Sequence, residues 1–594
     1  MINYKAPLRD YRFVLEEVLE VAQLAALPGY AEATPEIFAS VIEAAGTFCE
    51  HVLLPLNASG DREGCRYESG VVRTPRGFKA AYDRYRQDGW TAVDGDPEYG
   101  CQGLPHTLYY CVAELLFSAN LSFAMYPGLS SGAYRALRAH GNAEQQALYL
   151  PRLLAGTWSG TMCLTEPQCG SDLGLIQTRA MPDGDGVYRV TGTKVFISAG
   201  EHDLTENIVH LVLARLPDAP PGTHGISLFL VPKFLVAKDG TLGIRNAVSC
   251  IAIEHKMGLK ASATCAMSFD EAIGTLVGAP NTGMHQMFTM MNVSRLGVAL
   301  QGLGLGEVAY QNAVAYARER LQGRALTGAK MPGKVADPIL VHPDVRRMLL
   351  TMKANTEAAR ALCSWIGLSI DVAEKHPDDA TREAADDLVA LLTPVMKAYF
   401  SDAGFTAANL ALQVFGGHGY VSDNGIEQLV RDARITQIYE GTNAVQALDL
   451  VGRKLPMHKG RLLKRFLGII GAFIQENRAS PDMGEFTAPL GEVVGELQQV
   501  TGTLGQRAAQ NPDEAAAVAG EYLKLLALIA LAFMWARMAK IALAKVGGDE
   551  NDFYQAKLAT ARFFMARILP ETASLTAIIA AGARPLMELD VDGF

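Results

Sequence analysis

The residue with the clearest capacity for acid–base chemistry is Glu440, which lies in the stretch Arg434-Ile-Thr-Gln-Ile-Tyr-Glu-Gly-Thr-Asn443. Its carboxylate stands between Tyr439 and Gly441 in a mostly apolar neighbourhood, and burial in such a neighbourhood raises the pKa of a carboxyl group. A carboxylate with a raised pKa is a stronger base, so Glu440 is a candidate general base. Taken alone, the same residue is also consistent with a solvated surface glutamate.

Two further stretches combine glycines with hydrogen-bonding groups. The first, Met162–Asp172, reads Met-Cys-Leu-Thr-Glu-Pro-Gln-Cys-Gly-Ser-Asp and places hydroxyls and backbone amides close together, as a ligand with carbonyls and phosphates requires. The second, Phe415–Tyr420, reads Phe-Gly-Gly-His-Gly-Tyr and permits close approach of the backbone to a ligand. A capped turn in the first and a helix C-cap in the second are the structural alternatives.

Two glycine motifs match other chemistry but lack its structural context. Gly128–Gly132 fits G-x-S-x-G, which makes Ser130 the nucleophile of a serine hydrolase when a strand precedes it and a helix follows. No strand–helix alternation surrounds it, so we expect a loop between helices and keep the hydrolase as a distant alternative. Gly302-Leu-Gly-Leu-Gly306 follows no strand, so we expect close helix packing there. The sequence contains no His-Glu-x-x-His motif or Cys/His cluster, and we expect no metal site.

Composition narrows the classes of partner. The 594 residues include 53 Lys+Arg and 63 Asp+Glu, a net charge of −10, which argues against nucleic acid and anionic membranes as partners. Nine scattered cysteines without a C-x-x-C pair fit free thiols in a reducing compartment, and the start has no apolar signal segment, so we expect a cytoplasmic location. The apolar run Leu525–Ala536 is shorter than the roughly 20 residues of a membrane span, so we expect a buried helix.

The elements that position these residues change along the chain. After an arm over residues 1–34, the pattern is helical over 35–158, with a Thr34-Pro35 start signal and Gly-rich breaks at 95–103 and 128–132. Residues 159–280 carry short β-rich runs, which predicts a small, mostly antiparallel β domain. Helical periodicity returns over 281–455, including a helix that starts at Thr393-Pro394, and continues through 456–594. The expected runs of strand are Val187–Thr191, Lys194–Ile197, Ile208–Leu213, Ile226–Val231 and Ala266–Phe269.

Taken in this order and spacing, T-E-P-x-x-G-S-D, F-G-G-x-G and I-Y-E-G-T resemble the acyl-CoA dehydrogenase family over about residues 35–455. The resemblance implies a mainly α fold with an inserted β domain: an N-terminal α domain, a β-barrel-like middle domain and a four-helix bundle, here followed by a helical C-terminal extension. It implies non-covalently bound FAD, an acyl-CoA substrate that is oxidised to the trans-2-enoyl-CoA, and an electron-transferring flavoprotein as electron acceptor.

The resemblance also implies roles for residues at the reacting carbons. Glu440 takes the α-proton, its backbone N–H donates to the thioester carbonyl, and flavin N5 receives the β-hydride. Some relatives carry the base immediately before an arginine on the first bundle helix. Here that position is Ser294, before Arg295, and serine cannot act as this base. The departure strengthens the assignment of Glu440.

Matched positions supply the remaining predicted contacts. Phe196-Ile197-Ser198 replaces the family's W-I-T, so Phe196 is expected to pack on the flavin and Ser198 to bond N5. A segment longer than in many relatives, 323–343, follows Arg320. The predicted FAD contacts are Leu164, Thr165, Gly170, Ser171, Phe196, Ser198, Arg320, Gln322, Gln413, Gly416, Gly417 and Thr442, of which Arg320, Gln322, Gln413, Gly416 and Gly417 reach the FAD of a neighbouring subunit. The predicted substrate contacts are Ser171, Asn292, Arg295, Glu440 and Gly441.

The extension and the start Asn3–Asp10 resemble the roughly 600-residue bacterial branch of the family. That branch acts on fatty acyl-CoAs, our primary expectation, or on the thioether 3-methylmercaptopropionyl-CoA, and the sequence does not choose between them. Residues 456–594 carry 14 basic and 15 acidic residues, which argues against a DNA-binding relative. The short basic stretch Lys459–Arg465 is a weak membrane signal, and we expect no membrane association. We expect the extension to cover bundle surface and the protein to be a homodimer.

Overall fold

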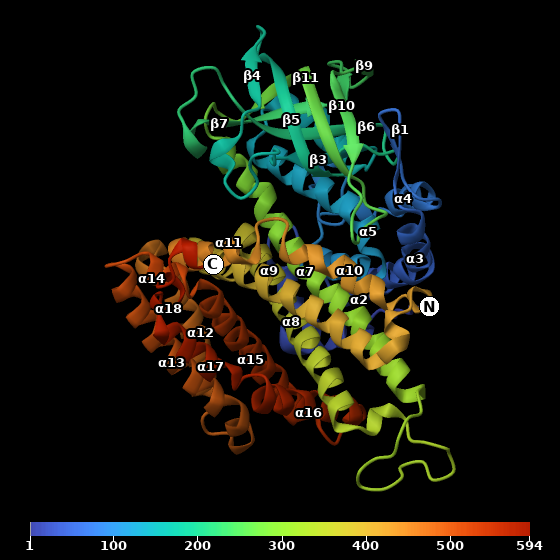
Figure 1. Cartoon of the computed structure of the whole chain (residues 1–594), viewed down its shortest axis with the longest axis vertical. Coiled ribbons are helices and arrows are strands. Elements are labelled where there is room, and N and C mark those ends of the chain that lie inside the picture. The colour runs from blue at the N-terminus through green and yellow to red at the C-terminus, as the bar shows by residue number, and fades with distance from the viewer. Residues whose placement is uncertain (1) are drawn as a thin grey trace. The chain divides into compact units, whose positions relative to one another are not determined.

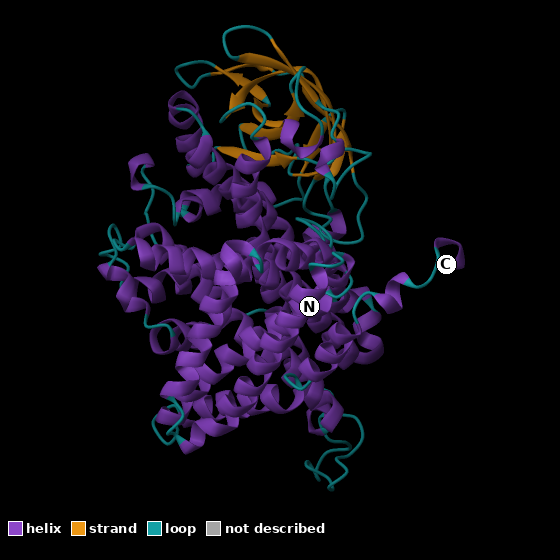
Figure 2. Cartoon of the chain, turned by 90° about the vertical axis from the view of Figure 1, so that its left-hand side faces the viewer, coloured by secondary structure: helices purple, strands orange, loops and turns teal. Residues whose placement is uncertain are grey.

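The computed structural model describes residues 2–594, which form two compact units, each made of segments distant in sequence (Figure 1). The bundle unit contains the chain up to Gly46, Pro105–Ser118 and Val298–Phe594. The sheet unit contains Thr47–Leu104 and Ala119–Gly297. The expectation of a mainly helical protein with an inserted β domain is confirmed, since every strand belongs to the sheet unit (Figure 2).

The sheet unit is built around a closed arrangement of strands. β11 pairs with β5, β5 with β4, β4 with β6, β6 with β7, and β7 returns to β11, which closes a barrel. β10 is added antiparallel to β11, and β3 is added parallel to β6, so the expected mostly antiparallel domain also has a parallel edge. The strands are β3 Trp158–Cys163, β4 Arg179–Pro182, β5 Val187–Ser198, β6 Asn207–Arg215, β7 Ile226–Pro232, β10 Val248–Ile253 and β11 Thr264–Val277.

The pattern of apolar residues in each strand reflects which faces of that strand are buried. β6 and β7 are buried along nearly their whole length, which explains their continuous apolar sequences, whereas β5 alternates between exposed and covered residues. The two separate runs expected at 187–191 and 194–197 are one strand, because Gly192 continues it. A Cβ at Gly192 would lie 2.3 Å from Thr178 Oγ1, so only glycine permits this approach.

Helices of the sheet unit cover one side of this barrel. α6 (Ala143–Leu154) begins at a capping box in which Asn142 and Gln145 each bond the other's backbone N–H. Together with the C-terminal part of α5 (His106–His140) it packs on β3, β6 and β7. Met287 and Met290 of α7 (Gly283–Glu319) are fully buried in this core, as ordinary packing predicts.

Gly128–Gly132 lies inside α5, so the expected loop between helices is wrong. Within this helical run, Ser130 Oγ donates to Tyr126 O, one turn earlier, at 3.2 Å. The same hydroxyl accepts the backbone N–H of Gly160. A nucleophile elbow requires a sharp turn between a strand and a helix, and this serine sits within a helix. The geometry therefore gives no support to a hydrolase at Ser130.

The bundle unit contains α8 (Pro343–Lys375) and α9 (Asp379–Phe415), packed against each other and against α7. The predicted helix start at Thr393-Pro394 is wrong: α9 begins earlier, where the Asp378 side chain caps it, and Pro394 lies inside. The expected close packing at Gly302 is confirmed, because a Cβ there would lie 2.1 Å from Phe400 O of α9. The bundle unit also contains α10 (Ile426–Arg434) and α11 (Asn443–Asp449).

The C-terminal extension covers α8 and α9 through one apolar helix, α15. Leu525–Ala536 is buried throughout, as predicted, and Trp535 Nε1 donates to Ala354 O of α8 at 3.0 Å. By length and composition alone, four helical stretches could cross a membrane; these are Pro35–Glu63, His106–His140, Ala519–Lys545 and Asn551–Ala581. The extension helices are α12 Arg461–Glu476, α13 Gly484–Ala508, α15 Ala519–Lys545, α16 Asn551–Arg567 and α17 Glu571–Ala581.

A buried charge network joins the extension to the rest of the bundle unit. Arg360 of α8 donates to Glu114 of α5 at 2.7 Å and also pairs with Glu307 of α7 and with Asp10. Lys557 of α16 bonds the same Asp10 and, at 2.8 Å, Glu357 of α8. Burial opposes ionisation of Asp10, but the charges of Lys557 and Arg360 hold its pKa below the usual value.

We predict that Arg360→Met destabilises the bundle unit by about 3–5 kcal/mol, because it leaves buried carboxylates without their cation. The measurement is the midpoint of urea unfolding. Arg347→Met is the matched control, since it removes an exposed pair with Asp344 and is expected to cost below about 1 kcal/mol. Equal shifts in the two variants would contradict a structural role for the network.

Candidate active site

Glu440 lies in a tight loop of the bundle unit, directly before α11. Its backbone has φ +61° and that of Gly441 has φ +84°, two consecutive residues in the left-handed region. A non-glycine residue there costs of the order of 1–3 kcal/mol and persists only where its surroundings enforce it. Tyr439, the preceding residue, is half-buried, and desolvation of its phenol together with the charge of Glu440 raises the pKa of that phenol. The Tyr439 hydroxyl donates to Gln301 Oε1 of α7.

Gln446 of α11 stabilises the conformation of this loop through hydrogen bonds. Its side chain is fully buried, and its Nε2 donates to the carbonyl oxygens of Glu440 and Gly441 at 3.3 and 3.4 Å. A Cβ at Gly441 would lie 2.6 Å from Gln446 Nε2, so position 441 requires glycine for space as well as for backbone angle. Thr442 ends the loop by capping α11, since its Oγ1 accepts from Val445 N at 3.2 Å. Neither Gln446 nor Gln301 was predicted as a site residue from the sequence.

Hydrogen bonds of the Asn443 side chain connect the start of α11 to α9. Its Nδ2 donates to Asp402 Oδ1 at 2.8 Å and to Ser401 Oγ at 3.0 Å, and its Oδ1 accepts from Lys397 Nζ at 2.9 Å. Lys397 has no exposed surface. Because these bonds involve residues of the long, buried helix α9, the loop that carries Glu440 is anchored on a rigid element.

In the sheet unit, a buried ion pair shapes the segment Leu164–Ser171 that follows β3. The carboxylate of Glu166 accepts from Lys194 Nζ at 2.8 Å and from Thr178 Oγ1 at 2.6 Å. Burial opposes its ionisation, but Lys194 and these hydrogen bonds lower the pKa of Glu166 to about 2. Lys194 Nζ also donates to Leu164 O at 3.0 Å, which fixes the predicted cofactor segment on β5. Lys194 was not predicted as a site residue, because no local motif marks it.

Phe196 projects from β5 at an irregularity in the sheet. Two residues of β5 stand opposite one residue of β11 here, because Ile197 pairs with Cys265 and Lys194 with Met267. The bulge gives Phe196 a φ of +59° and leaves its side chain 63% exposed. Its neighbour Val195 donates to Thr165 O at 2.9 Å. An exposed ring thus stands beside the hydroxyl-bearing segment, an arrangement suited to a planar ligand with hydrogen-bonding edges.

The five residues predicted to reach a neighbouring subunit's FAD gather at the ends of two helices. Tyr316 near the end of α7 stacks on Phe415 at the end of α9, with ring centroids 4.1 Å apart. Tyr316 also pairs with His418 at 2.8 Å, and neither contact was anticipated from the sequence. A Cβ at Gly416 or Gly417 would meet no atom within 4 Å, so this backbone is open to a ligand. The exposed residues collected here are Arg320, Gln322, Gln413, Gly416 and Gly417.

The predicted substrate residues are divided between the units. Ser171, Asn292 and Arg295 belong to the sheet unit, whereas Glu440 and Gly441 belong to the bundle unit. Ser171 and Asn292 are exposed, and Arg295 is buried with its guanidinium 5.7 Å from the ring centroid of Phe288. Among residues 2–594, no group of three or more His, Cys, Asp or Glu side chains is placed to hold a metal ion.

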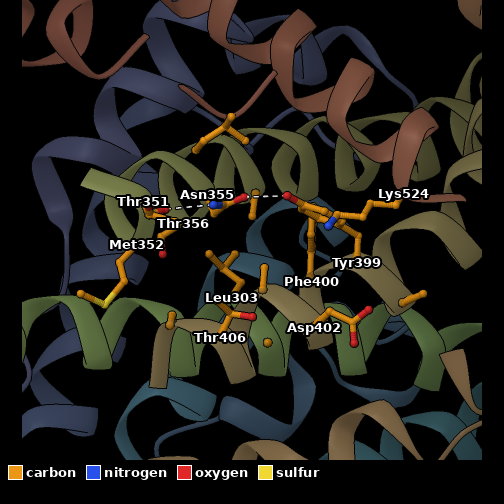
Figure 3. Close-up of a pocket in the computed structure, with 18 of the residues that line it drawn as sticks. Leu303, Thr351, Met352, Asn355, Thr356, Tyr399, Phe400, Asp402, Thr406 and Lys524 are labelled. Atoms are coloured by element: carbon orange, nitrogen blue, oxygen red, sulfur yellow. Dashed lines mark hydrogen bonds between the residues drawn. The ribbon is translucent and has the colours of Figure 1, made fainter. Parts of the chain in front are cut away.

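A cavity of about 610 Å³ lies in the bundle unit, between α7, α8, α9 and α11 on one side and the extension helices α15–α17 on the other (Figure 3). On its wall, Tyr399 donates to Asn355 Oδ1 at 2.9 Å. None of the predicted site residues lines this cavity, although Asn443 does. No sequence motif marks this cavity, because its lining residues come from many separate helices.

Comparisons with known proteins match the chain in four segments. The acyl-CoA dehydrogenase N-terminal domain matches residues 39–157, the middle domain 161–272 and the C-terminal domain 281–455. A domain described as acetyl-CoA dehydrogenase C-terminal like matches residues 466–590.

Individual relatives match over the full length. The 3-methylmercaptopropionyl-CoA dehydrogenase of Ruegeria pomeroyi is 41% identical over 96% of this chain and 97% of its own. The broad-specificity linear acyl-CoA dehydrogenase FadE5 of Mycobacterium tuberculosis is 33% identical over 100% of both chains. An acyl-CoA dehydrogenase of Bacillus anthracis, solved in complex with FAD, shares the fold with a TM-score of 0.75 and 20% identity, over 96% of this chain and 91% of its own. The chain therefore belongs to the acyl-CoA dehydrogenase family, oxidoreductases that act on CH–CH donors.

Proposed function

We propose that this protein is an FAD-dependent dehydrogenase that converts a fatty acyl-CoA to the trans-2-enoyl-CoA, with Glu440 as the catalytic base. The observation that carries the proposal is the strained backbone of Glu440, which Gln446 and the glycine at 441 enforce. Strain in a non-glycine residue is retained where the position of its side chain matters to function. A glutamate with only a surface role would gain nothing from this conformation.

The chemistry explains why the carboxylate needs this support. The α-proton of a thioester is too weakly acidic for a solvated carboxylate, so the base must be desolvated and held within reach of the proton. Glu440 is half-buried, and its loop is fastened to α11 by Gln446 and to α9 through Asn443. These contacts restrict the directions that the carboxylate can take and so reduce the entropy lost in reaching the reactive geometry.

The hydride that leaves the β-carbon needs an acceptor that no side chain provides. Members of the family use FAD, and FAD supplies that acceptor. The residues of this chain fit the group: Phe196 offers an exposed ring for stacking, and Thr165 and Ser198 offer hydroxyls beside it. The Glu166–Lys194 pair holds these segments together without contacting solvent, and so fixes the shape of the site.

Two acyl groups are candidates for the substrate of this protein. Straight-chain fatty acyl-CoA is the first candidate. The thioether 3-methylmercaptopropionyl-CoA is the second, because the relative that carries its name is 41% identical over nearly the whole chain. We further propose that electrons pass to an electron-transferring flavoprotein and that the protein acts in the cytoplasm.

We predict that anaerobic addition of the correct acyl-CoA bleaches the flavin absorbance, and that Glu440→Gln slows this bleaching roughly 10²–10⁴-fold because it removes the base. The panel runs from butyryl- to stearoyl-CoA and includes 3-methylmercaptopropionyl-CoA, and the fastest substrate identifies the acyl group. Asp423→Asn, an exposed carboxylate in a nearby loop, is the control and should bleach at the normal rate. Undiminished bleaching in Glu440→Gln would refute the role of this residue.

Gly441→Ala tests the geometry of the loop. The added methyl group collides with Gln446 and disfavours the φ of +84°, so Glu440 is displaced. We expect kcat to fall roughly 10²-fold, with the ratio of FAD to protein unchanged. Gly452→Ala is the matched control, because a Cβ there meets no atom within 4 Å. An active Gly441→Ala enzyme would show that the loop tolerates movement.

Phe196→Ala tests the cofactor assignment independently of turnover. Loss of the stacking ring is expected to weaken FAD binding to the apoprotein about tenfold, since aromatic stacking contributes about 1–3 kcal/mol. Ile244→Ala, which truncates another exposed apolar residue of the sheet unit, should leave FAD affinity as it was. Equal FAD affinities in the two variants would place the flavin away from Phe196.

A further inference from the structure

The loop that joins α7 to α8, Gly323–Pro338, is a protruding but well-organised part of the bundle unit (Figure 1). Asp337 stabilises the loop. Its fully buried carboxylate accepts hydrogen bonds from the backbone N–H groups of Ala325, Lys330 and Met331 at 2.7–3.1 Å. Arg324 adds an ion pair to the same carboxylate at 3.3 Å. A carboxylate that collects several backbone donors fixes the loop in one conformation.

This fixed loop presents apolar and cationic side chains to solvent. Leu326 is 94% exposed and Val335 is 93% exposed, and the exposed Met331 lies between them in the sequence. Lys330 and Lys334 are exposed and form no ion pair with any of residues 2–594. Isolated exposed apolar residues are ordinary, but a rigid loop that offers three of them among free cations has the composition of a binding surface.

A second segment, Arg584–Phe594, combines exposed apolar side chains with negatively charged ones. Leu589, Val591 and Phe594 are exposed, the last two by 87% and 91%. Asp590 and Asp592 alternate with them and form no ion pair with residues 2–594. Figure 2 shows this segment standing away from the helices of the bundle unit. We refer to it as the tail.

We propose that the loop Gly323–Pro338 of one protomer binds the tail Arg584–Phe594 of a second copy of this chain. In a two-fold symmetric dimer the same contact then forms twice. The lysines at 330 and 334 face the aspartates at 590 and 592, and the apolar residues between them are buried together.

Charge complementarity selects this partner. The loop carries unpaired cations and the tail unpaired anions, and each alternates them with large apolar side chains. An anionic membrane attracts the loop but repels the aspartates of the tail, so it accounts for one segment only. A second copy of the chain accounts for both. The loop also begins just after Arg320 and Gln322, which places the proposed contact beside the exposed patch at the ends of α7 and α9.

Charge reversal in the full-length holoprotein tests the proposal, with self-association measured by sedimentation and light scattering. We expect K330E/K334E and D590K/D592K each to raise the dimer dissociation constant about tenfold or more, and their combination to restore it to within about threefold. E476K/D549K makes the same change in charge as the tail variant at exposed acids elsewhere, and should leave association unchanged. Equal association in all variants, or no recovery in the combination, overturns the proposal.

A carbodiimide cross-link gives a direct second measurement, because it joins a lysine to a carboxylate in contact. We expect peptides that join Lys330 or Lys334 to Asp590 or Asp592, with one isotope-labelled and one unlabelled partner when the two forms are mixed. Cross-links within single chains only, or none between these segments, refute the contact. Binding of the wild type, but not K330E/K334E, to vesicles of phosphatidylcholine and phosphatidylserine would identify a lipid surface instead and also overturn it.

Discussion

Arg360 sets the main electrostatic constraint on the bundle unit. Three carboxylates from three different segments converge on its guanidinium, and all are buried where an uncompensated charge is costly. Lys557 supplies the second cation from the extension, by way of the shared Asp10. The extension is therefore part of the electrostatic balance of the bundle as well as a cover for its apolar surface.

Both candidate functional residues have the same strained backbone conformation in different surroundings. Glu440 and Phe196 are non-glycine residues in the left-handed region, one in a loop before a helix and the other at a β-bulge. A buried polar contact lies close to each residue. Gln446 bonds the carbonyl oxygen of Glu440, and Lys194, two residues before Phe196 on β5, pairs with Glu166. Backbone strain of this kind is retained where the position of a side chain matters to function, in agreement with the roles that we propose for these two residues.

The sequence predicted what is local and missed what is assembled across long separations. Apolar patterning located α15 and four of the strands, β5, β6, β7 and β11, and the three motifs located the segments at 164–171, 415–420 and 439–442. A helix start at Thr393-Pro394 was expected because proline favours the first turn, but α9 accommodates it internally. Lys194 and Gln446 were missed, since each acts on a motif residue from a neighbouring element. The Arg360 network was not predicted for the same reason: residues bonded within it are up to 547 positions apart.

The bond between Asp10 and Lys557 spans 547 positions, which has a consequence for biosynthesis. At about 5–20 residues per second, roughly half a minute to two minutes separates the synthesis of these two residues. The sheet unit, by contrast, is complete once Gly297 has left the ribosome. At that stage the nascent chain contains the complete sheet unit. Its first forty-odd residues, whose acidic groups are still solvated, have not yet met Lys557, which is synthesised almost last. The order of translation therefore favours assembly of the sheet unit before closure of the bundle unit.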